Sequence, residues 1–595
     1  MEQRGSLLRW VLIGGAVFLF MTFGMPALCG KGDPTARQPL THDDQTTAPE
    51  EPKEEQICEL VGTRFNAEVT SKGASLKKLW LEGPKYQTHG PLGPKEPMQI
   101  VTTWRPGRLP LRTNLRAPAD TEQVAYDDLD WQLDESASDD TRCVFRYRDD
   151  KTELEKTLSS TERPYEIAMT LKVTNLAKDA QRHRLSVEQA DWRTAAETKG
   201  SFGRQSEFLT QSEGRAGEKI KRFGDGDFAP KSFADEDFTD EKWRRLPGDA
   251  KWVAVSSAYF SKALFPVAGP AVPAAEALIE ELWGSNFREK DKDPDFGHTY
   301  RARLVYPAQE LGQGSSTSYE VLAYIGPKER EVLATLGGGQ LGGADLLDLG
   351  TFGAIGKVLV SYLHILYRLV GQWGWAICLL TITVKLLLFP LSISQIKSGM
   401  AMRRLKPEMD ELNAKYKDNP TQKGLAIQEL WRKNKVTNPL LGCLPLLLQM
   451  PVWWALYTSL QTAVELYHMP FTPFQFLVPD LSQPGKYFVI PILLGISSFI
   501  QQMLMPAQGD PMQQKLMRYL MPGIFTVMML FLPAGLGIYF LTNTWLGIGQ
   551  QLAVERFYKA RAAKAEAARV ETPEPPAPKP GAPFGKGKSR VQQRG

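Results

Sequence analysis

One apolar stretch that holds a single cation decides the fold of this chain: Thr381-Ile382-Thr383-Val384-Lys385-Leu386-Leu387-Leu388-Phe389. It lies inside the longer apolar run Trp373–Leu391, which at about 1.5 Å per residue is long enough to cross a hydrocarbon core of about 30 Å. A lysine in the middle of a membrane costs about 2.5–3.5 kcal/mol, so such a residue usually faces a partner or a water-filled cavity. The stretch therefore predicts a membrane protein in which Lys385 is the leading candidate for a functional residue.

Two explanations of Lys385 remain open at this point. The first is snorkelling, because Lys385 lies about six residues, or roughly 9 Å, from the cytoplasmic end of its span, and its flexible stem can cover much of that distance. The second is a polar helix face, made of residues at spacings of three, seven and fourteen along the helix: Cys378, Thr381, Lys385 and Ser392. A polar stripe exposed to lipid would be costly, so the second explanation predicts a hydrated cavity that is open to the cytoplasm.

Five further apolar runs predict additional spans, which makes six in all: Trp10–Leu28, Leu440–Leu460, Tyr487–Met505, Leu516–Leu532 and Leu536–Val554. Several of these spans carry polar side chains: Gln449, Gln501, Gln502, Thr526, Thr542, Asn543 and Thr544. Such side chains either hold helices together or line the same cavity as Lys385.

The loop at residues 392–438 determines the predicted sidedness of the spans. It carries ten lysines and arginines against five acids, so it is predicted to be cytoplasmic. Both ends of the chain are then cytoplasmic, and the segment after the first span is exported. Ser394–Lys417 and Thr421–Asn434 predict a helical hairpin, which either docks acidic lipid, ribosomal RNA or a nascent chain or is merely a solvated amphipathic surface.

The exported segment, residues 58–335, predicts a β domain. Apolar and polar residues alternate with a period of two, as in Ile167, Met169, Leu171 and Val173, and similar runs recur between turn residues. This pattern predicts a large antiparallel sandwich with one solvated face per sheet. Cys58 and Cys143 lie in this domain, and their positions allow either one disulfide or two unpaired thiols.

The remaining segments complete the predicted domain organisation. Residues 1–29 predict an uncleaved transmembrane anchor, with a cleaved signal peptide as the alternative. Residues 30–57, rich in Pro, Thr, Asp and Glu, predict a disordered linker. Residues 352–370, with His364 among apolar residues, predict an amphipathic helix along the membrane surface. Residues 371–554 form the membrane core, and residues 555–595 a basic cytoplasmic tail that begins helically and is disordered from Thr572.

Motifs for catalysis, cofactors and metals are missing from the sequence. It contains no HExxH or GxSxG motif and no Cys/His set at zinc spacing. Gly337–Gly342 formally fits a dinucleotide-binding loop, but without a βαβ unit around it a glycine linker is favoured. The near match to a P-loop at residues 585–589 has Ala582 where the first glycine belongs. From the missing motifs we expect no catalytic residue, cofactor or metal. The net charge of +4 is too small to indicate recognition of a specific nucleic-acid sequence.

Four segments of the membrane half resemble the YidC/Oxa/Alb family of membrane protein insertases: Gly371–Trp375, Asn438–Pro451, Asp510–Lys515 and Phe531–Leu536. The resemblance is strong over Phe352–Val554. It is looser in the β domain, where it rests on Lys72–Leu76, Trp252–Phe260 and Tyr324–Pro327. A large exported domain after the first span is similar to the Gram-negative form of the family.

The resemblance implies a multi-domain fold: an α-helical polytopic membrane bundle of six spans with a five-helix insertase core, plus a large antiparallel β-sandwich in the periplasm. It implies an insertase and chaperone of the bacterial inner membrane that draws a client's polar segment into a groove. Lys385 stands where the family usually has Arg, which keeps the charge but loses the planar guanidinium. Thr381, Tyr539 and Phe540 match family positions that look like substrate contacts, and Gln449 is added to this groove as a polar group of the third span.

The partners implied by the resemblance are nascent membrane proteins, the Sec translocon, membrane lipid, and the ribosome through the hairpin and the basic tail. Two other functions are alternatives. A secondary transporter predicts inverted repeats and paired carboxylates at mid-membrane, and neither is evident in the sequence. An anchored sugar-binding β domain is suggested only by the predicted sandwich.

Overall fold

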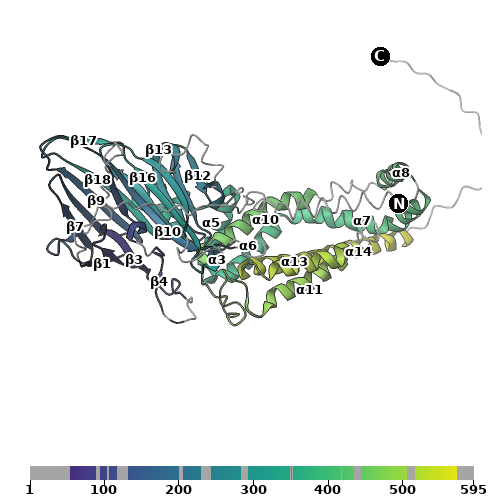
Figure 1. The fold of residues 1–595 in the computed structure, drawn as a ribbon. Coiled ribbons are helices and arrows are strands. Elements are labelled where there is room, and N and C mark those ends of the chain that lie inside the picture. Colours follow the sequence, from purple (N-terminus) through teal and green to yellow (C-terminus); the bar gives the residue numbers. More distant parts are fainter. Residues whose placement is uncertain are drawn as a thin grey trace, which may run out of the picture.

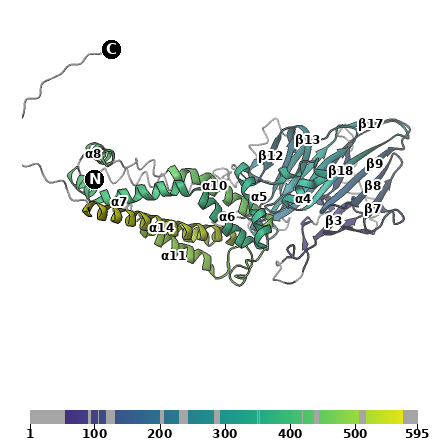
Figure 2. The same cartoon turned by 180° about the vertical axis from the view of Figure 1, so that it is seen from behind.

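A computed structural model of the chain describes residues 54–88, 94, 96–103, 106–116, 131–199, 206–228, 243–282, 292–348, 350, 353–416, 419–434, 444–504 and 516–571. The molecule is elongated, with a β domain at one end and a set of helices that extends away from it (Figure 1 and Figure 2). The predicted anchor at residues 1–29, most of the linker at 30–57, the segment Asp510–Lys515 and the tail from Thr572 lie outside the described residues.

Two antiparallel sheets form the β domain. The smaller sheet has four strands in the order β1 (Ile57–Gly62), β2 (Phe65–Thr70), β3 (Ser75–Leu81) and β4 (Met98–Gln99). The larger sheet has 14 strands. Its main path runs β17 (Gln309–Leu311), β10 (Gln181–Thr194), β16 (Gly297–Val305), β15 (Ala274–Leu282), β13 (Arg244–Ser256), β14 (Phe260–Ala268), β18 (Ser316–Pro327), β9 (Glu166–Asn175), β8 (Thr152–Ser160), β7 (Arg142–Arg148) and β6 (Gln132–Leu133). Off this path, β5 (Arg112–Arg116) pairs with β10, and β11 (Gln211–Ala216) pairs with both β12 (Lys219–Phe223) and β13.

The strand pattern follows from burial. On β9, the alternating residues Ile167, Met169, Leu171 and Val173 are all buried, while the residues between them are more exposed. Strands β13 and β18 instead carry unbroken buried runs, Trp252–Val255 and Val321–Ile325, because both faces of these strands are covered. The prediction of a large antiparallel β domain is therefore confirmed.

A disulfide joins the two sheets. Cys58 on β1 and Cys143 on β7 are bonded, with their Cα atoms 6.0 Å apart and a separation of 85 positions in sequence. This settles the alternative that the sequence left open. The bond ties the small N-terminal sheet to the edge region of the large sheet.

The glycine-rich segment is packed rather than an open linker. It forms two short 3-10 helices, η6 (Leu336–Gly339) and η7 (Gly343–Leu346), and Leu336 and Leu346 are buried in the β-domain core. Gly337 has a φ of 55° and donates its N–H to a Glu166 carboxylate oxygen at 3.1 Å. The glycines here supply a left-handed backbone, so the prediction of a linker is wrong, while the rejection of a dinucleotide loop stands.

Eight main helices follow the β domain in the described residues: α5 (Gly353–Val370), α6 (Trp373–Leu387), α7 (Phe389–Lys415), α8 (Pro420–Lys433), α10 (Leu444–Thr462), α11 (Val489–Leu504), α13 (Met521–Met529) and α14 (Ala534–Glu571). Two helices in this part of the chain, Gly353–Val370 and Lys486–Leu504, are long and apolar enough to cross a membrane. The bent pair α6–α7 makes a third if it counts as one span. The described helices thus provide two or three candidate spans by length and composition.

Helix α6 ends earlier than the apolar run predicts. It stops at Leu387, and α7 begins at Phe389 with a change of direction of 61°. Pro390 explains the break, because proline has no N–H to donate to the Leu386 carbonyl and its ring clashes with the preceding turn. Ser392 therefore lies on α7, and the prediction that it continues the polar face of Lys385 is wrong.

The predicted hairpin agrees with α7 and α8. Asn419 caps α8 by accepting a hydrogen bond from the Gln422 N–H at 3.1 Å, and Pro420 occupies the first turn, where its missing N–H is harmless. Helix α14 runs on to Glu571, well past the predicted span Leu536–Val554, so the first part of the basic tail is helical as predicted.

The β domain and the helices are packed against each other. Val464 and Tyr467, in the segment after α10, are buried in the β-domain core. The Tyr467 ring lies 4.8 Å from the Tyr259 ring and 5.5 Å from the Phe260 ring. The two parts of the chain therefore share a core at this boundary.

Lys85 lies at the same boundary and makes stability depend on pH. Burial lowers the pKa of Lys85 from its ordinary 10.5 to about 8, against the carboxylates of Glu465 and Glu329, which raise it. Because the native pKa is below the unfolded one, the folded chain binds fewer protons between these two values, so stability should rise as pH increases from about 8 to 10.5. The shift corresponds to at most about 3 kcal/mol.

Unfolding of the full chain, followed at pH 8 and pH 10.5, tests this expectation. Lys85→Met should be more stable than the parent at pH 8 and should lose much of the pH dependence, whereas Lys151→Met, at an exposed position, should behave like the parent. If the unfolding free energy of Lys85→Met changed with pH as much as that of the parent, the pH dependence would not come from Lys85.

Candidate functional site

Lys385 points into the helical bundle. A Cβ atom placed on Gly547 of α14 would lie 3.8 Å from the Lys385 Nζ and 2.7 Å from the Gln501 Nε2 of α11. Lys385 is half-buried, while the next two residues of α6, Leu386 and Leu387, are 65% and 78% exposed on the outer side. The ammonium therefore sits between α6, α11 and α14 rather than on the outer surface with its neighbours.

No side chain in the described part of the chain forms a hydrogen bond or an ion pair with Lys385. Glu555, on the same helix as Gln551, is instead engaged at the far end of the bundle by Arg403. A buried cation without a partner in the protein is unfavourable unless water or a ligand solvates it. The arrangement leaves the charge of Lys385 available to a bound molecule.

The polar groups near Lys385 on α6, α11 and α14 mostly form hydrogen bonds within or between these helices. Thr381 is 1% exposed, and its hydroxyl donates to the Ile377 carbonyl at 2.7 Å within its own helix. Cys378 and Thr542 connect α6 to α14 through an Sγ–Oγ1 distance of 3.5 Å. The Trp545 indole N–H donates to Ser497 Oγ at 2.8 Å and so connects α14 to α11.

Tyr539 and Phe540 lie in the apolar core on the β-domain side of Lys385. They are 2% and 7% exposed, and the Phe540 ring meets the Phe525 ring of α13 edge-on at 5.1 Å. Together with Thr381, one turn before Lys385, they form a packed layer between the ammonium and the β domain. Gln449 lies in α10, but its side chain is outside the described residues, so its place in the site stays a prediction.

Sequence reasoning missed Gly547, which gives Lys385 and Gln501 their room. A glycine inside an apolar helical run was the available signal, since small residues let transmembrane helices approach closely. Similar close approaches occur between Gly495 and Thr526 and between Gly537 and Ile490, where an added Cβ would meet atoms at 2.3 and 2.7 Å.

Filling the space at Gly547 should impair the site without unfolding the bundle. We expect Gly547→Val to displace Gln501 and crowd Lys385, and to lower the insertion activity that the family resemblance implies, measured in liposomes, about tenfold, equivalent to about 1.4 kcal/mol. Gly549→Val is the matched control, because a Cβ on Gly549 meets nothing within 4 Å. Equal insertion by the two variants would show that the space at Gly547 is not used.

The helical hairpin α7–α8 is fixed to the core at its base. Arg403 of α7 donates to the Leu504 carbonyl at the end of α11 and lies 3.7 Å from a Glu555 carboxylate oxygen. Gln551 donates to the same carbonyl, and the Lys397 ammonium lies 5.0 Å from the Tyr558 ring centroid. These contacts hold the basic helix α7 beside the extension of α14.

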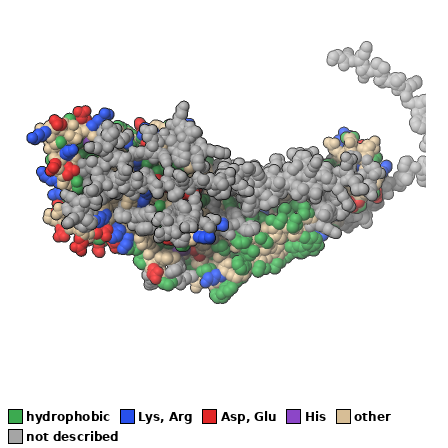
Figure 3. All heavy atoms as spheres, in the orientation of Figure 1, with side chains coloured by type: hydrophobic (Ala, Val, Ile, Leu, Met, Phe, Trp, Pro, Cys, Tyr) green, Lys and Arg blue, Asp and Glu red, His purple; other side chains and the backbone are tan. Residues whose placement is uncertain are grey.

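The outer surface of the bundle is apolar. Figure 3 shows hydrophobic side chains gathered over α11 and α13, away from the charged surface of the β domain. Large exposed residues there include Ile492, Ile496, Ile500, Met503, Ile524 and Val527. A face of this kind fits contact with lipid. Among the described residues, no group of three or more His, Cys, Asp or Glu side chains could hold a metal ion.

Comparisons with known proteins cover both halves of the chain. Residues 60–362 match the family described as YidC periplasmic domain, and residues 365–562 match the family described as 60Kd inner membrane protein. The membrane protein insertase YidC of Anaeromyxobacter sp. (strain Fw109-5) is 33% identical over 508 residues, which cover 84% of this chain and 85% of that protein.

Two further comparisons cover similar shares of the chain. The YidC of Nitrosococcus oceani is 32% identical over 477 residues, 78% of this chain and 79% of the relative. The crystal structure of an active YidC insertase with its first transmembrane domain resolved aligns with 92% of this chain and 99% of that one, at 16% identity and a TM-score of 0.35. On the strength of the sequence matches across both halves, the chain belongs to the YidC family of membrane protein insertases.

Proposed function

We propose that Lys385 is the fixed positive charge of a groove through which this insertase receives the polar segment of a client protein. The observation that carries the proposal is the position of the ammonium between Gly547 and Gln501, without an anionic partner among the described side chains. At an effective dielectric constant of about 20, two opposite charges about 12 Å apart attract by about 1.4 kcal/mol. An acidic client tail would thus be drawn toward Lys385.

The groove is proposed to reach only partway through the membrane. Thr381, Tyr539 and Phe540 are buried on the β-domain side of Lys385, which supports a closed outer end and an opening toward the cytoplasm. Gln449 is proposed to add a further polar group. Such a groove shortens the hydrocarbon path of a polar segment and reduces its desolvation.

The energy for insertion is proposed to come from the client itself. Burial of the client's apolar span in lipid contributes roughly 25 cal/mol per Å², and the membrane potential assists an acidic tail. No nucleotide hydrolysis is required in this scheme, and the YidC family is not enzymatic.

The proposed topology has six spans, with both termini in the cytoplasm of a bacterial inner membrane and the β domain, a sandwich, in the periplasm. The five core helices α6, α10, α11, α13 and α14 support it. Helix α6 has 15 residues, and the apolar helix Leu516–Met529, which ends with α13, has 14, so they rise about 22 and 21 Å, which favours a locally thinned bilayer.

Helix α5 is proposed to lie along the outer membrane surface rather than to span it. His364 lies 3.1 Å from the Glu465 carboxylate, and Arg368 pairs with Glu331 of the β domain at 2.6 Å. Partners in exported segments at both positions support a helix that stays on that side.

The partners are proposed from the surfaces of the chain. Membrane-protein clients follow from the family. The basic hairpin α7–α8, together with the basic extension of α14, is proposed to contact the ribosome and anionic lipid, and cooperation with the Sec translocon is proposed from the family resemblance. The contact between Arg403 and Glu555 supports a joint basic surface, because it holds α7 and α14 side by side.

Cysteine labelling tests the groove directly. In a chain with Cys29, Cys378 and Cys443 changed to serine and the Cys58–Cys143 disulfide kept, Lys385→Cys should react with a membrane-impermeant maleimide from the cytoplasmic side. Leu386→Cys is the matched control, since Leu386 faces outward and should resist labelling. If Lys385→Cys did not react with the maleimide, water would not reach this position, and the proposed groove would have no physical basis.

A further inference from the structure

The loop between α10 and α11, residues 463–488, is a folded part of the structure. Leu466, Phe471 and Leu481 are buried in the apolar core of the helices. The Leu481 carbonyl accepts a hydrogen bond from the Gly535 N–H at 2.9 Å, and a Cβ atom placed on Gly374 of α6 would lie 2.1 Å from the Phe471 ring. The loop is therefore held against the first turns of α6 and α14.

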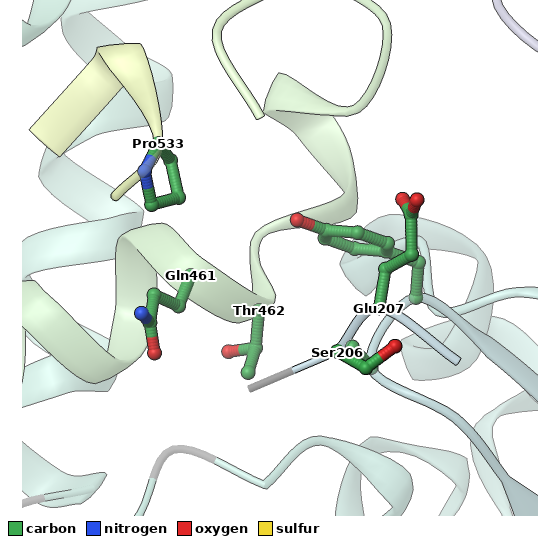
Figure 4. A pocket seen from close by; sticks show the side chains of 7 residues that line it. Ser206, Glu207, Gln461, Thr462 and Pro533 are labelled. Atoms are coloured by element: carbon green, nitrogen blue, oxygen red, sulfur yellow. The ribbon is translucent and has the colours of Figure 1, made fainter. Parts of the chain in front are cut away.

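The same loop is docked on the β domain. Gln483 Nε2 donates a hydrogen bond to a Glu207 carboxylate oxygen at 3.1 Å, and a ring nitrogen of His468 lies 3.2 Å from the Lys85 carbonyl oxygen. Figure 4 shows this boundary from close by, where Glu207 and Gln461 of α10 line one small pocket. With partners in both parts of the chain, the loop holds the β domain at a set position relative to the helices.

The outer side of the loop carries exposed aromatic residues on two segments, 472–476 and 486–488. We call Phe474, Phe476, Tyr487 and Phe488 the aromatic tip; all four are exposed, Phe476 to 71%. The Phe476 ring stacks on the Tyr487 ring with their centroids 5.4 Å apart, so the two segments meet in one patch. Large aromatic side chains exposed together are unfavourable in water, which points to a partner outside the described chain.

Two residues of the aromatic tip have a backbone conformation that is rare for aromatic residues. Tyr487 and Phe488 have φ values of 59° and 54°, in the left-handed region where a Cβ atom crowds the backbone. Both residues are more than half exposed, so packing inside the protein does not account for this conformation. Residues held in such conformations cluster at binding sites, which supports a partner at this surface.

The apolar face of α11 continues the aromatic tip. Ile492, Ile496 and Ile500 are exposed and follow Phe488 at intervals of four residues, which places them along one face of the helix. They belong to the apolar surface over α11 and α13 (Figure 3). The surface that fits lipid contact thus reaches the loop without a break.

The chemistry of the loop places the aromatic tip at the level of the lipid headgroups. Irregular backbone does not occur in contact with lipid in the hydrocarbon region, because its N–H and C=O groups would lack partners there. Aromatic side chains and lysines collect instead at the headgroup level. Lys486 is exposed beside Tyr487, and the sequences of segments 472–476 and 486–488 contain no Asp or Glu.

We infer that the aromatic tip inserts among the phospholipid headgroups of the outer leaflet, and that residues 463–488 thereby set the height of the β domain above the membrane. The inference rests on the proposed topology, which puts this loop on the same side of the membrane as the β domain. The aromatic rings contact the headgroups and the upper part of the acyl chains. The other side of the loop keeps its contacts with the β domain.

Depth-dependent fluorescence quenching in phosphatidylcholine vesicles tests the inference. In the full chain with Cys29, Cys378 and Cys443 changed to serine and the disulfide kept, Phe476→Cys carries the fluorescent label NBD. Phosphatidylcholine with a doxyl group near the headgroup should quench this label about twice as strongly as phosphatidylcholine with the doxyl group near the chain end. Phe474→Cys provides a second position in case Phe476→Cys does not fold, and should give the same order.

Val267→Cys is the matched control, because Val267 is an exposed apolar residue of the β domain, at 55%. It follows Phe260, which lies at the boundary with the helices, by seven residues of β14, or about 23 Å along the strand. A label there should be quenched by iodide in the water and by neither doxyl lipid. Doxyl quenching as strong as that of Phe476→Cys would overturn the inference.

Three results at Phe476→Cys would also overturn the inference. Stronger quenching by the deep doxyl group would place the aromatic tip in the hydrocarbon region. Quenching by iodide alone would place it in water. Protection from both kinds of quencher would show that protein, such as a second copy of the chain, covers the aromatic tip.

The side of the membrane is measured separately from the depth. In bacterial cells with a permeabilised outer membrane and an intact inner membrane, an impermeant maleimide should label Phe476→Cys. Failure of this labelling, with shallow quenching kept, would overturn the proposed topology and the assignment to the outer leaflet, but not the headgroup contact. Failure of the shallow quenching, with labelling kept, would overturn this inference and leave the topology and the groove standing.

Discussion

Lys385→Glu should nearly abolish insertion of a client with an acidic tail into liposomes, and Lys385→Ala should reduce it about tenfold, while Lys385→Arg should retain most of it. Lys385 has no hydrogen-bond or ion-pair partner among the described side chains. Its replacement therefore removes the attraction to the client and breaks no ion pair among those side chains. Loss of an attraction of about 1.4 kcal/mol corresponds to tenfold, and reversal of the charge adds repulsion of similar size.

The charge of the client tail makes this prediction sharper. With a neutral tail, Lys385→Ala should insert nearly as well as the parent, because only the electrostatic part is lost. Lys357→Ala, at an exposed cation on α5, serves as the matched control and should leave insertion unchanged. Equal insertion of the acidic client by the parent, Lys385→Ala and Lys385→Glu would defeat the electrostatic role.

Removal of the Cys58–Cys143 disulfide should lower the unfolding free energy of the β domain by about 4 kcal/mol. The bond closes a loop of 85 residues, so its loss returns a large conformational entropy to the unfolded chain. Both sulfurs are buried, so the double variant Cys58→Ala/Cys143→Ala is preferable to a reducing agent. Urea unfolding of the full chain, followed by tryptophan fluorescence, measures the difference.

Cys378→Ala is the control for this measurement, because Cys378 is a free thiol in the helical bundle. It should leave the β-domain transition unchanged. A double variant as stable as the parent would mean that the contacts between β1 and β7 alone hold the small sheet in place.

The β domain could be predicted from local pattern, but not its pairing order. Alternation on Ile167–Val173 is visible in the sequence because one face of that strand is covered more completely than the other. The neighbours β14 and β18 of the sheet are far apart in the chain, and so are Arg64 and Glu329, whose side chains bond at 2.7 Å. No local signal reports such pairs, since they depend on how the whole sheet closes.

The helical part shows the limits of hydropathy. The apolar run Trp373–Leu391 continues across Pro390, although the helix stops at Leu387, because transfer free energy depends on side chains and not on backbone hydrogen bonds. Hydropathy alone does not distinguish an insertase from a secondary transporter. The match to insertases along most of the chain decides in favour of the insertase. The glycines at 337–342 show a related limit, because glycine suits both an open linker and a packed left-handed turn.

The sequence by itself determined that a lysine inside an apolar run needs an explanation, and that an alternating domain is a β structure, and its basic loop predicts the sidedness of the spans. These conclusions follow from composition and period, which are properties of neighbouring residues. Only the tertiary structure decided which way Lys385 points, that Gly547 and Gln501 surround it, and that Cys58 meets Cys143. Those facts depend on contacts between segments that are far apart in the chain. The packing of whole helices and sheets determines which of these segments come close to each other.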